Sequence, residues 1–309
     1  MFGGFETTQE TYVSDTPGRR PLPRHREGAE VLTAELLLAT CTSWPHGEPG
    51  HERLDAALAA RDISSRWVSW DDPGVDWAGA GLVAVRATWD YDTRLPEFLG
   101  WAERVGSRLL HGADVFRWNT DKAYLVELAR RGRVPVVPTV TVDDLADLRA
   151  AVDRFGEIVV KPRIGAGGRG VVTVSADKEP ASPRPGTMIA QPLVASVRTE
   201  GEVSVFVIDG RPISQVRKQP ADGEIRVHEQ YGGVTYPSTL TEEAATLAAD
   251  AVAASAAILG ADLVYARVDV MRHEGELMVS EVEITEPGLY LDVLPDNAEP
   301  FADAIARRL

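Results

Sequence analysis

Three carboxylates lie close together near the end of the chain, in a stretch that predicts two strands joined by a tight turn. Asp269 falls on the first strand, and Glu281 and Glu283 fall on the second. Strand side chains alternate between faces, so Glu281 and Glu283 point the same way. A three-residue loop at 273–275 would place Asp269 on that face too, whereas a two-residue loop would place it opposite. Converging carboxylates repel one another, and a hard cation such as Mg²⁺ would remove that cost. The alternative is a hairpin carrying ordinary exposed acids.

A lysine and a glycine-rich loop follow one another in the middle of the chain. Lys161 ends a predicted strand, and the loop at residues 165–170 contains Gly165, Gly167 and Gly168 before a second apolar strand. Glycine lets backbone N–H groups approach phosphate oxygens, and the lysine adds a positive charge. Because a strand follows rather than a helix, the loop is neither a P-loop nor a dinucleotide-binding fingerprint. The pattern predicts a flexible flap over the phosphates of a nucleotide.

Two further features could contact a nucleotide. Lys122 falls in the first turn of a helix predicted at residues 119–131, where a cation opposes the helix dipole. A bound phosphate would offset that repulsion, although a solvated lysine is the alternative. The apolar segment at residues 191–194 contains Gln191, Leu193 and Val194, and its backbone could pair with an adenine edge.

Basic residues gather in the second half of an otherwise acidic chain. They are Arg217, Lys218, Arg226 and His228. Cations opposite carboxylates suit phosphoryl transfer, because negative charge develops on the group being transferred. The alternative is that these residues form ordinary surface ion pairs.

Composition limits the classes of partner. The chain has 309 residues and a formal net charge of −15, which argues against binding to nucleic acid or to an anionic membrane surface. Its single cysteine, Cys41, allows no internal disulfide, and we expect its side chain to be buried and to serve only in packing. No apolar run approaches the ~20 residues that span a bilayer, and we expect a cytoplasmic protein. Residues 1–30 show no periodicity and are expected to be a mobile extension.

Predicted strands and helices alternate from residue 31 onward, which indicates a parallel sheet with helices on its faces. In such sheets ligands bind beyond the carboxyl ends of the strands. Arg86, Trp89, Asp90 and Tyr91 follow one such end and are candidates for substrate contact. The alternative is a polar loop with two packed aromatic side chains.

Taken together, these motifs resemble the ATP-grasp superfamily. The lysine before a glycine flap, the QPLV segment, the GEVSVFVIDGRPISQVRK hairpin and the three carboxylates carry the resemblance, which covers residues 119–291. It implies an α/β N-terminal domain with a parallel sheet at 31–118, followed by two α+β subdomains at 119–187 and 188–309. ATP would be held between these two subdomains, with Mg²⁺ as the metal.

The resemblance also implies roles for individual residues. Lys122, Lys161 and the flap would hold the phosphates of ATP. Gln191, Leu193 and Val194 would face the adenine, and Glu202 would lie near the ribose or the substrate. Asp269, Glu281 and Glu283 would bind Mg²⁺, and the candidate catalytic cations are Arg226, Arg267 and Lys218. Arg86 would hold the substrate carboxylate, while Trp89, Asp90 and Tyr91 would shape the pocket.

One departure separates the chain from the peptide-ligase members, which usually carry Glu-x-Asn where this chain has Glu281-Val282-Glu283. The strings RATWDY, RWNTDK, VRKQP and VEITEPGLYL are more similar to the branch that contains D-cycloserine synthetase. That branch implies an ATP-dependent ligase that turns a small amino-acid-like carboxylate into an acylphosphate and cyclises it. The alternatives are a ligase that joins side chains of a precursor peptide, and a non-catalytic nucleotide-binding regulator. A homodimer is also a possibility.

Overall fold

The first sheet of the protein is parallel, as predicted. The computed structural model describes residues 36–177 and 188–309, so the extension predicted at 1–30 lies outside the described residues. The strands have the order β2-β1-β3 and are β1 (Leu36–Thr40), β2 (Ser65–Ser69) and β3 (Leu82–Ala87). Strands β1 and β3 are buried along their whole length, which explains their continuous apolar sequence. Helices α1 (His51–Ala59) and α2 (Leu95–Val105) belong to the same part of the chain.

Residues 108–110, which follow α2, add no strand to this sheet. Gly106, at φ +64°, ends α2 and begins the 3₁₀ helix η2 (Gly106–Arg108). After it, Leu109 makes only an isolated bridge to Val83. The apolar residues of this segment therefore pack as a turn beside β3 rather than extending the sheet.

The second sheet is antiparallel and has the order β4-β7-β5-β6. Its strands are β4 (Val140–Val142), β5 (Ile158–Pro162), β6 (Val172–Val174) and β7 (Met188–Pro192), and α5 (Leu145–Phe155) packs on it. The Asp144 side chain caps α5 by accepting the N–H groups of Ala146 and Asp147. Because β7 pairs with β4 and β5, the boundary predicted between residues 187 and 188 would cut a strand from its sheet. The pairing of β7 with β4 and β5 therefore keeps residues 188–192 with the second sheet.

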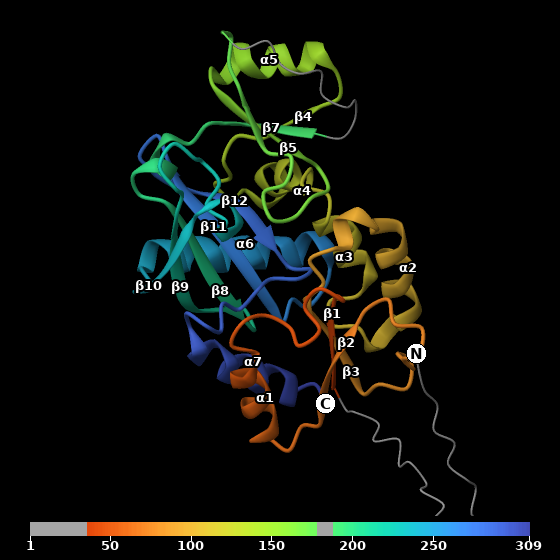
Figure 1. Ribbon diagram of the computed structural model, residues 1–309. Helices are drawn as coiled ribbons and strands as arrows, with labels where there is room; N and C mark the ends of the chain where they lie inside the picture. The colour runs from red at the N-terminus through yellow and green to blue at the C-terminus, as the bar shows by residue number, and fades with distance from the viewer. Residues whose placement is uncertain (1–35, 178–187) are drawn as a thin grey trace, which may run out of the picture. The chain divides into compact units, whose positions relative to one another are not determined.

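The third sheet carries the hairpin of carboxylates at one edge. Its order is β10-β9-β8-β11-β12, and its strands are β8 (Glu202–Ile208), β9 (Arg211–Gln219), β10 (Val234–Ser238), β11 (Tyr265–His273) and β12 (Glu276–Glu283). Helix α6 (Glu242–Leu259) is capped by Thr241 and lies across this sheet (Figure 1). The sequence did not predict β10, whose strand pairs with β9 after the Gly232-Gly233 break. Among the described residues, no helix is long and apolar enough to span a membrane.

The helix predicted at residues 119–131 is instead broken into three pieces. They are the end of α3 (Ala113–Asn119), α4 (Tyr124–Glu127) and a π-helical turn (Leu128–Gly132). Asn119 does not cap a helix, because its side chain is used elsewhere: its amide donates to the Val282 carbonyl at 2.7 Å. Lys122 consequently lies in the turn between α3 and α4, and not in the first turn of a helix. The last helix is α7 (Ala298–Ala306).

The turn between β11 and β12 differs from the predicted three-residue loop. His273 pairs directly with Glu276, so only Glu274 and Gly275 form the turn. Both have positive φ angles, of 53° and 89°, which is the backbone conformation that two-residue hairpin turns require. By itself, this turn would put Asp269 on the wrong face.

A β-bulge in β12 restores the alignment. Val270 pairs with Val279, but Asp269 pairs with Glu281, which leaves Ser280 as an extra residue. Directly opposed residues share a face of the sheet, and one inserted residue reverses the alternation beyond it. The bulge therefore places Asp269 on the same face as Glu281, which is the outcome expected from a longer loop.

A buried histidine makes the stability of this region depend on pH. His111 accepts the Val264 N–H at Nε2 (2.9 Å), and its Nδ1 lies 2.9 Å from the Ile284 carbonyl. Burial lowers the pKa of His111 to about 4. The unfolded chain binds a proton near pH 6.5 that the folded chain rejects, so this contribution is complete above pH 6.5 and is lost as the pH falls toward 4. A shift of that size corresponds to about 3 kcal/mol.

We expect urea unfolding of the wild type to show this loss between pH 6.5 and 4. His111→Asn should flatten the pH profile in that window, and asparagine tolerates the φ of +69° at this position. His273→Gln, on the hairpin, is the matched control and should retain the wild-type profile. Identical profiles for wild type and His111→Asn would contradict the assignment.

Candidate active site

A cavity of about 470 Å³ brings the predicted residues together. Its walls come from the second sheet and its loops, from the third sheet, and from the loops that follow β1 and β3. Of the predicted residues it is lined by Trp89, Tyr91, Lys122, Lys161, Gly165, Gly167, Gly168, Gln191, Leu193, Val194, Glu202, Lys218, Arg226, Arg267, Asp269, Glu281 and Glu283. Of the predicted residues, Arg86, Asp90 and Arg217 do not line the cavity.

Part of the cavity wall is apolar. Val137, Val159, Val194 and Met271 belong to it, and apolar side chains of this kind suit a flat heteroaromatic ring. The Gln191 amide donates to Thr139 Oγ1 at 2.9 Å, so its side chain is held within the wall. These contacts agree with a role for residues 191–194 beside a nucleobase, a role that stays a prediction.

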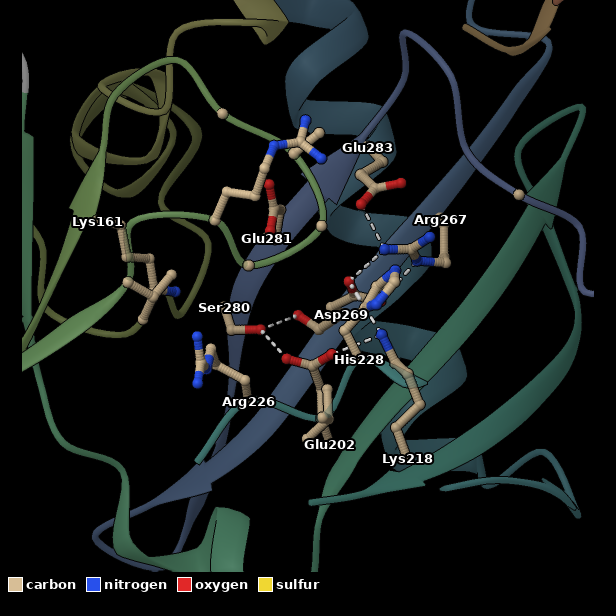
Figure 2. A pocket seen from close by; sticks show the side chains of 18 of the residues that line it. Lys161, Glu202, Lys218, Arg226, His228, Arg267, Asp269, Ser280, Glu281 and Glu283 are labelled. Atoms are coloured by element: carbon tan, nitrogen blue, oxygen red, sulfur yellow. Dashed lines mark hydrogen bonds and ion pairs between the residues drawn. The ribbon is translucent and has the colours of Figure 1, made fainter. Parts of the chain in front are cut away.

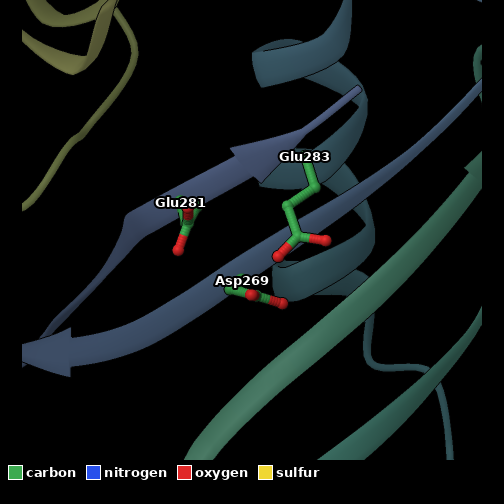
Figure 3. A group of neighbouring side chains, drawn as sticks. All are labelled: Asp269, Glu281 and Glu283. Carbon is green, nitrogen blue, oxygen red and sulfur yellow. The ribbon is translucent and has the colours of Figure 1, made fainter. Parts of the chain in front are cut away.

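The three carboxylates form one cluster on β11 and β12 (Figure 3), and all three line the cavity. Asp269, Glu281 and Glu283 each offer an oxygen within 4.8 Å of the others. Mg²⁺ prefers carboxylate oxygens. The oxygen donors present here therefore fit a magnesium site.

The charges around the cluster are arranged in pairs. Arg267 holds Asp269 through two hydrogen bonds, from Nε at 2.9 Å and from Nη2 at 2.8 Å, and it also contacts Glu283 (Figure 2). Burial opposes ionisation of Asp269, but Arg267 and Lys218 outweigh it and lower its pKa. Burial raises the pKa of Glu283 to about 7 despite Arg267. A metal cation would supply the positive charge that this surplus of carboxylates still needs.

Two lysines face the cluster from the other wall. Lys122 Nζ lies 2.5 Å from Glu281 and donates to the Gly165 carbonyl at 3.0 Å. Burial lowers the pKa of Lys161, which lines the cavity beside it. Phosphate oxygens would favour the charged form of both lysines, in keeping with their predicted role.

The glycine loop between β5 and β6 covers the lysines. Gly167 and Gly168 have φ angles of +60° and +70°, which side-chain-bearing residues rarely adopt. Arg169 pairs with Asp92 at 2.6 Å, and Asp92 also accepts the Ala166 N–H. The loop is thus anchored to the segment that follows β3, and its backbone faces the cavity.

We expect Gly168→Ala to raise the KM for ATP by about tenfold, because a Cβ at this φ is strained and would lie 3.2 Å from Tyr231 Cε2. Gly260→Ala is the matched control, since Gly260 has a φ of +62° with open space around its Cβ position and lies at the end of α6. It should lower stability without changing KM. Equal KM values for ATP in both variants would contradict a flap role.

The basic residues lie in two different settings, a strand of the third sheet and the loop between β9 and β10. Lys218 is buried and lies 2.6 Å from Glu202 and 3.5 Å from Asp269. Arg226 pairs with Glu224 at 2.5 Å and stacks its guanidinium 3.6 Å from the centre of the Tyr231 ring. Figure 2 shows Lys218 and Arg226 in the same pocket as the carboxylates.

The substrate residues predicted after β3 need correction. Arg86 is fully buried and pairs with Glu48 at 2.6 Å, between the rings of Tyr265 and Phe301. It cannot reach a ligand in the cavity, so it does not hold the substrate carboxylate. Asp90 instead accepts a hydrogen bond from Trp70 Nε1 at 2.9 Å.

Three buried polar residues that line the cavity were not among the predicted site residues. Asn119 fixes the chain after β12, accepting the Ile284 and Thr285 N–H groups at 2.8 and 3.0 Å. Glu48 and Glu286 are buried carboxylates that line the cavity. The string TEPG, which follows Glu281 and Glu283, could have marked Glu286 as a site residue. Glu48 lies in a loop whose sequence contains no motif.

Comparisons with known proteins agree with this geometry. Two family models match, the N-terminal domain of D-cycloserine synthetase DcsG over residues 36–111 and the ATP-grasp domain of prokaryotic glutathione synthetase over residues 132–295. The cycloserine biosynthesis protein DcsG of Streptomyces lavendulae is 36% identical over 270 residues, which are 80% of this chain and 89% of that protein. The glutathione synthetase of Parasynechococcus marenigrum is 29% identical over 234 residues, 71% of this chain and 69% of that protein.

Solved structures show the same fold. The crystal structure of D-cycloserine synthetase DcsG superposes with a TM-score of 0.77 at 31% identity, covering 88% of this chain and 99% of that one. The ATP-grasp ligase PsnB, solved with a minimal precursor, gives a TM-score of 0.60 at 16% identity and covers 89% of this chain and 100% of that one. At that identity, the second likeness concerns the fold alone.

Proposed function

Because the chain belongs to the ATP-grasp family of ADP-forming carbon–nitrogen ligases, we propose that it activates the carboxylate of a small amino acid with ATP and then closes a C–N bond within the same molecule, as in the synthesis of D-cycloserine. One observation supports this most. The metal-type carboxylates share the cavity with residues from the loops that follow β1 and β3, in the part matched by the D-cycloserine synthetase model. A cytoplasmic location and a homodimer stay predictions.

The first step forms an acylphosphate. A carboxylate oxygen of the substrate bonds to the γ-phosphorus of ATP, and the bond to ADP breaks. Lys122 and Lys161 hold the phosphates, and the flap at residues 165–170 excludes water. Mg²⁺, bound by Asp269, Glu281 and Glu283, would neutralise the charge that develops on the phosphoryl oxygens.

The second step makes the C–N bond. A nitrogen of the substrate bonds to the acyl carbon, phosphate leaves with the electron pair of the broken C–O bond, and the nitrogen loses a proton to solvent or phosphate. Arg226 and Arg267 lie in the cavity where they can stabilise the departing phosphate. Since both reacting groups belong to one molecule, proximity supplies much of the acceleration.

The experiment is to measure ADP release with a panel of amino-acid carboxylates that includes O-ureido-D-serine, followed by mass spectrometry of the product. Loss of carbon dioxide and ammonia from O-ureido-D-serine is the result we expect, because water then cleaves the carbamoyl group from the ring nitrogen and the released carbamate breaks down to carbon dioxide and ammonia. Loss of water alone would indicate simple ligation, with the carbamoyl group retained. Absence of ADP with every small carboxylate would overturn the proposal. It would then favour a precursor peptide as the substrate, or a non-catalytic nucleotide-binding regulator.

A further inference from the structure

The segment between β12 and α7 places a carboxylate beyond the metal-type cluster. Along the hairpin from its turn, cavity-lining residues follow in the order Met271, then Asp269 and Glu281, then Arg267 and Glu283. Met271 belongs to the apolar part of the wall, and the carboxylates follow it along the hairpin. The next acid in the chain is Glu286, three residues beyond Glu283, and it lines the same cavity, so it can contact a substrate bound there.

The Glu286 carboxylate has no cation of its own. Only 6% of the residue is exposed, it lines the cavity, and among the described residues no hydrogen bond or ion pair reaches its side chain. The basic groups facing it are already engaged, because Lys122 pairs with Glu281 and Arg267 pairs with Asp269 and Glu283. A buried, unpaired carboxylate is costly unless a ligand supplies the missing donor.

The backbone on both sides of Glu286 is held firmly. On one side Asn119 accepts the Thr285 N–H at 3.0 Å, and the Trp89 indole donates to the carbonyl of Glu286 itself at 3.2 Å. On the other side Glu48 accepts the N–H groups of Leu289 and Tyr290, at 2.7 and 2.8 Å. The carboxylate is thus presented from a rigid frame, as a recognition group should be.

Two aromatic residues of the cavity wall lie close to this segment. Trp89 and Tyr290 both line the cavity, and each has an atom within 4 Å of the Cβ position of Gly288, which is two residues after Glu286. Trp44 packs edge-on against Trp89 with ring centroids 5.2 Å apart. Aromatic faces beside a carboxylate favour a compact organic cation over a neutral or anionic group.

We propose that Glu286 binds the ammonium group of the substrate, so that the site selects free α-amino acids over carboxylates that lack the amine. The inference deepens the proposed function. It rests on that function only in assuming that a small carboxylate binds in the cavity beside the nucleotide. Arg86, buried behind Glu48, acts through that carboxylate to position residues 289 and 290 and does not touch the substrate.

The test is calorimetric binding in the presence of Mg²⁺ and ADP, which needs no turnover. The probes are O-ureido-D-serine and its deamino analogue, 3-(ureidooxy)propanoate. The wild type should bind the amino compound at least about 100-fold more tightly, and Glu286→Gln should bind the two compounds within a few-fold of each other. Glu276→Gln, an exposed acid at the start of β12, is the matched control and should behave as wild type.

Affinity for Mg·ADP should be the same in all three proteins, which separates the substrate role of Glu286 from an effect on the metal cluster. Equal binding of the two probes by the wild type, no binding of the amino compound, or unchanged discrimination in Glu286→Gln would each overturn the inference. If discrimination is found but no ADP is released from any carboxylate, the proposed function fails and the ammonium subsite stands.

Discussion

Glu281→Ala is expected to lower the rate of substrate-dependent ADP formation by about 10³-fold, the largest effect on activity that we predict. The change removes one oxygen of the metal-type cluster and also the partner that Lys122 contacts at 2.5 Å. The metal site would then lose one ligand and Lys122 would lose the partner that orders it, so the charge that develops on the transferring phosphoryl group would be stabilised less. The measurement is a coupled assay of ADP release at saturating ATP over a range of Mg²⁺ concentrations.

Glu276→Gln again serves as the control, because it changes an acid on the same strand outside the cavity. Circular dichroism should show that Glu281→Ala folds as the wild type does. If the Glu281→Ala protein formed ADP at the wild-type rate with substrate present, the metal assignment of the hairpin would be wrong, although the fold would stand.

Glu48→Ala is expected to destabilise the protein by about 3–5 kcal/mol, the largest effect on stability that we predict. It leaves the fully buried Arg86 without its carboxylate, and it leaves the N–H groups of Leu289 and Tyr290 without their acceptor. Two of the three guanidinium nitrogens of Arg86 already lack a hydrogen-bond partner, so no other group can replace Glu48. Urea denaturation measures the loss.

The double variant Glu48→Gln, Arg86→Met removes both charges and should recover most of the stability, because a buried pair replaced as a unit leaves no unpaired ion. Glu52→Ala, an exposed acid in the first turn of α1, is the control and should change stability by less than about 0.5 kcal/mol. A Glu48→Ala protein as stable as the control would show that the pair does not hold the N-terminal sheet to residues 289 and 290.

Local patterns predicted what depends on local chemistry. Strand periodicity predicted the parallel first sheet and the carboxylate hairpin, and the lysine–glycine loop and the three carboxylates were singled out by residue type and spacing. Thr241 and Asp144 cap helices as their side chains allow. In each case the property that decides the structure lies within a few residues of the position concerned.

Positions set by distant partners could not be predicted. Asn119 looks like a helix cap, but its amide serves residues that follow β12 more than 160 positions away. Arg86 stands where ligands often bind, yet Glu48 engages it from another loop. The bulge at Ser280 depends on how β12 pairs with β11. The turn is shorter than predicted and the bulge was not predicted, but together they place Asp269 on the same face as Glu281, as expected. Likewise β7 joins β4 and β5 through pairing that no boundary signal reveals.

The measurement that tests the central claim most directly is transfer of oxygen from substrate to phosphate. O-ureido-D-serine labelled with ¹⁸O in its carboxylate is turned over with ATP and Mg²⁺, and the released phosphate is analysed by mass spectrometry. An acylphosphate formed in this site predicts one ¹⁸O in each phosphate, because the oxygen that attacks the γ-phosphorus leaves with it. Unlabelled phosphate accompanying ADP would mean that water attacks ATP, and would contradict carboxylate activation.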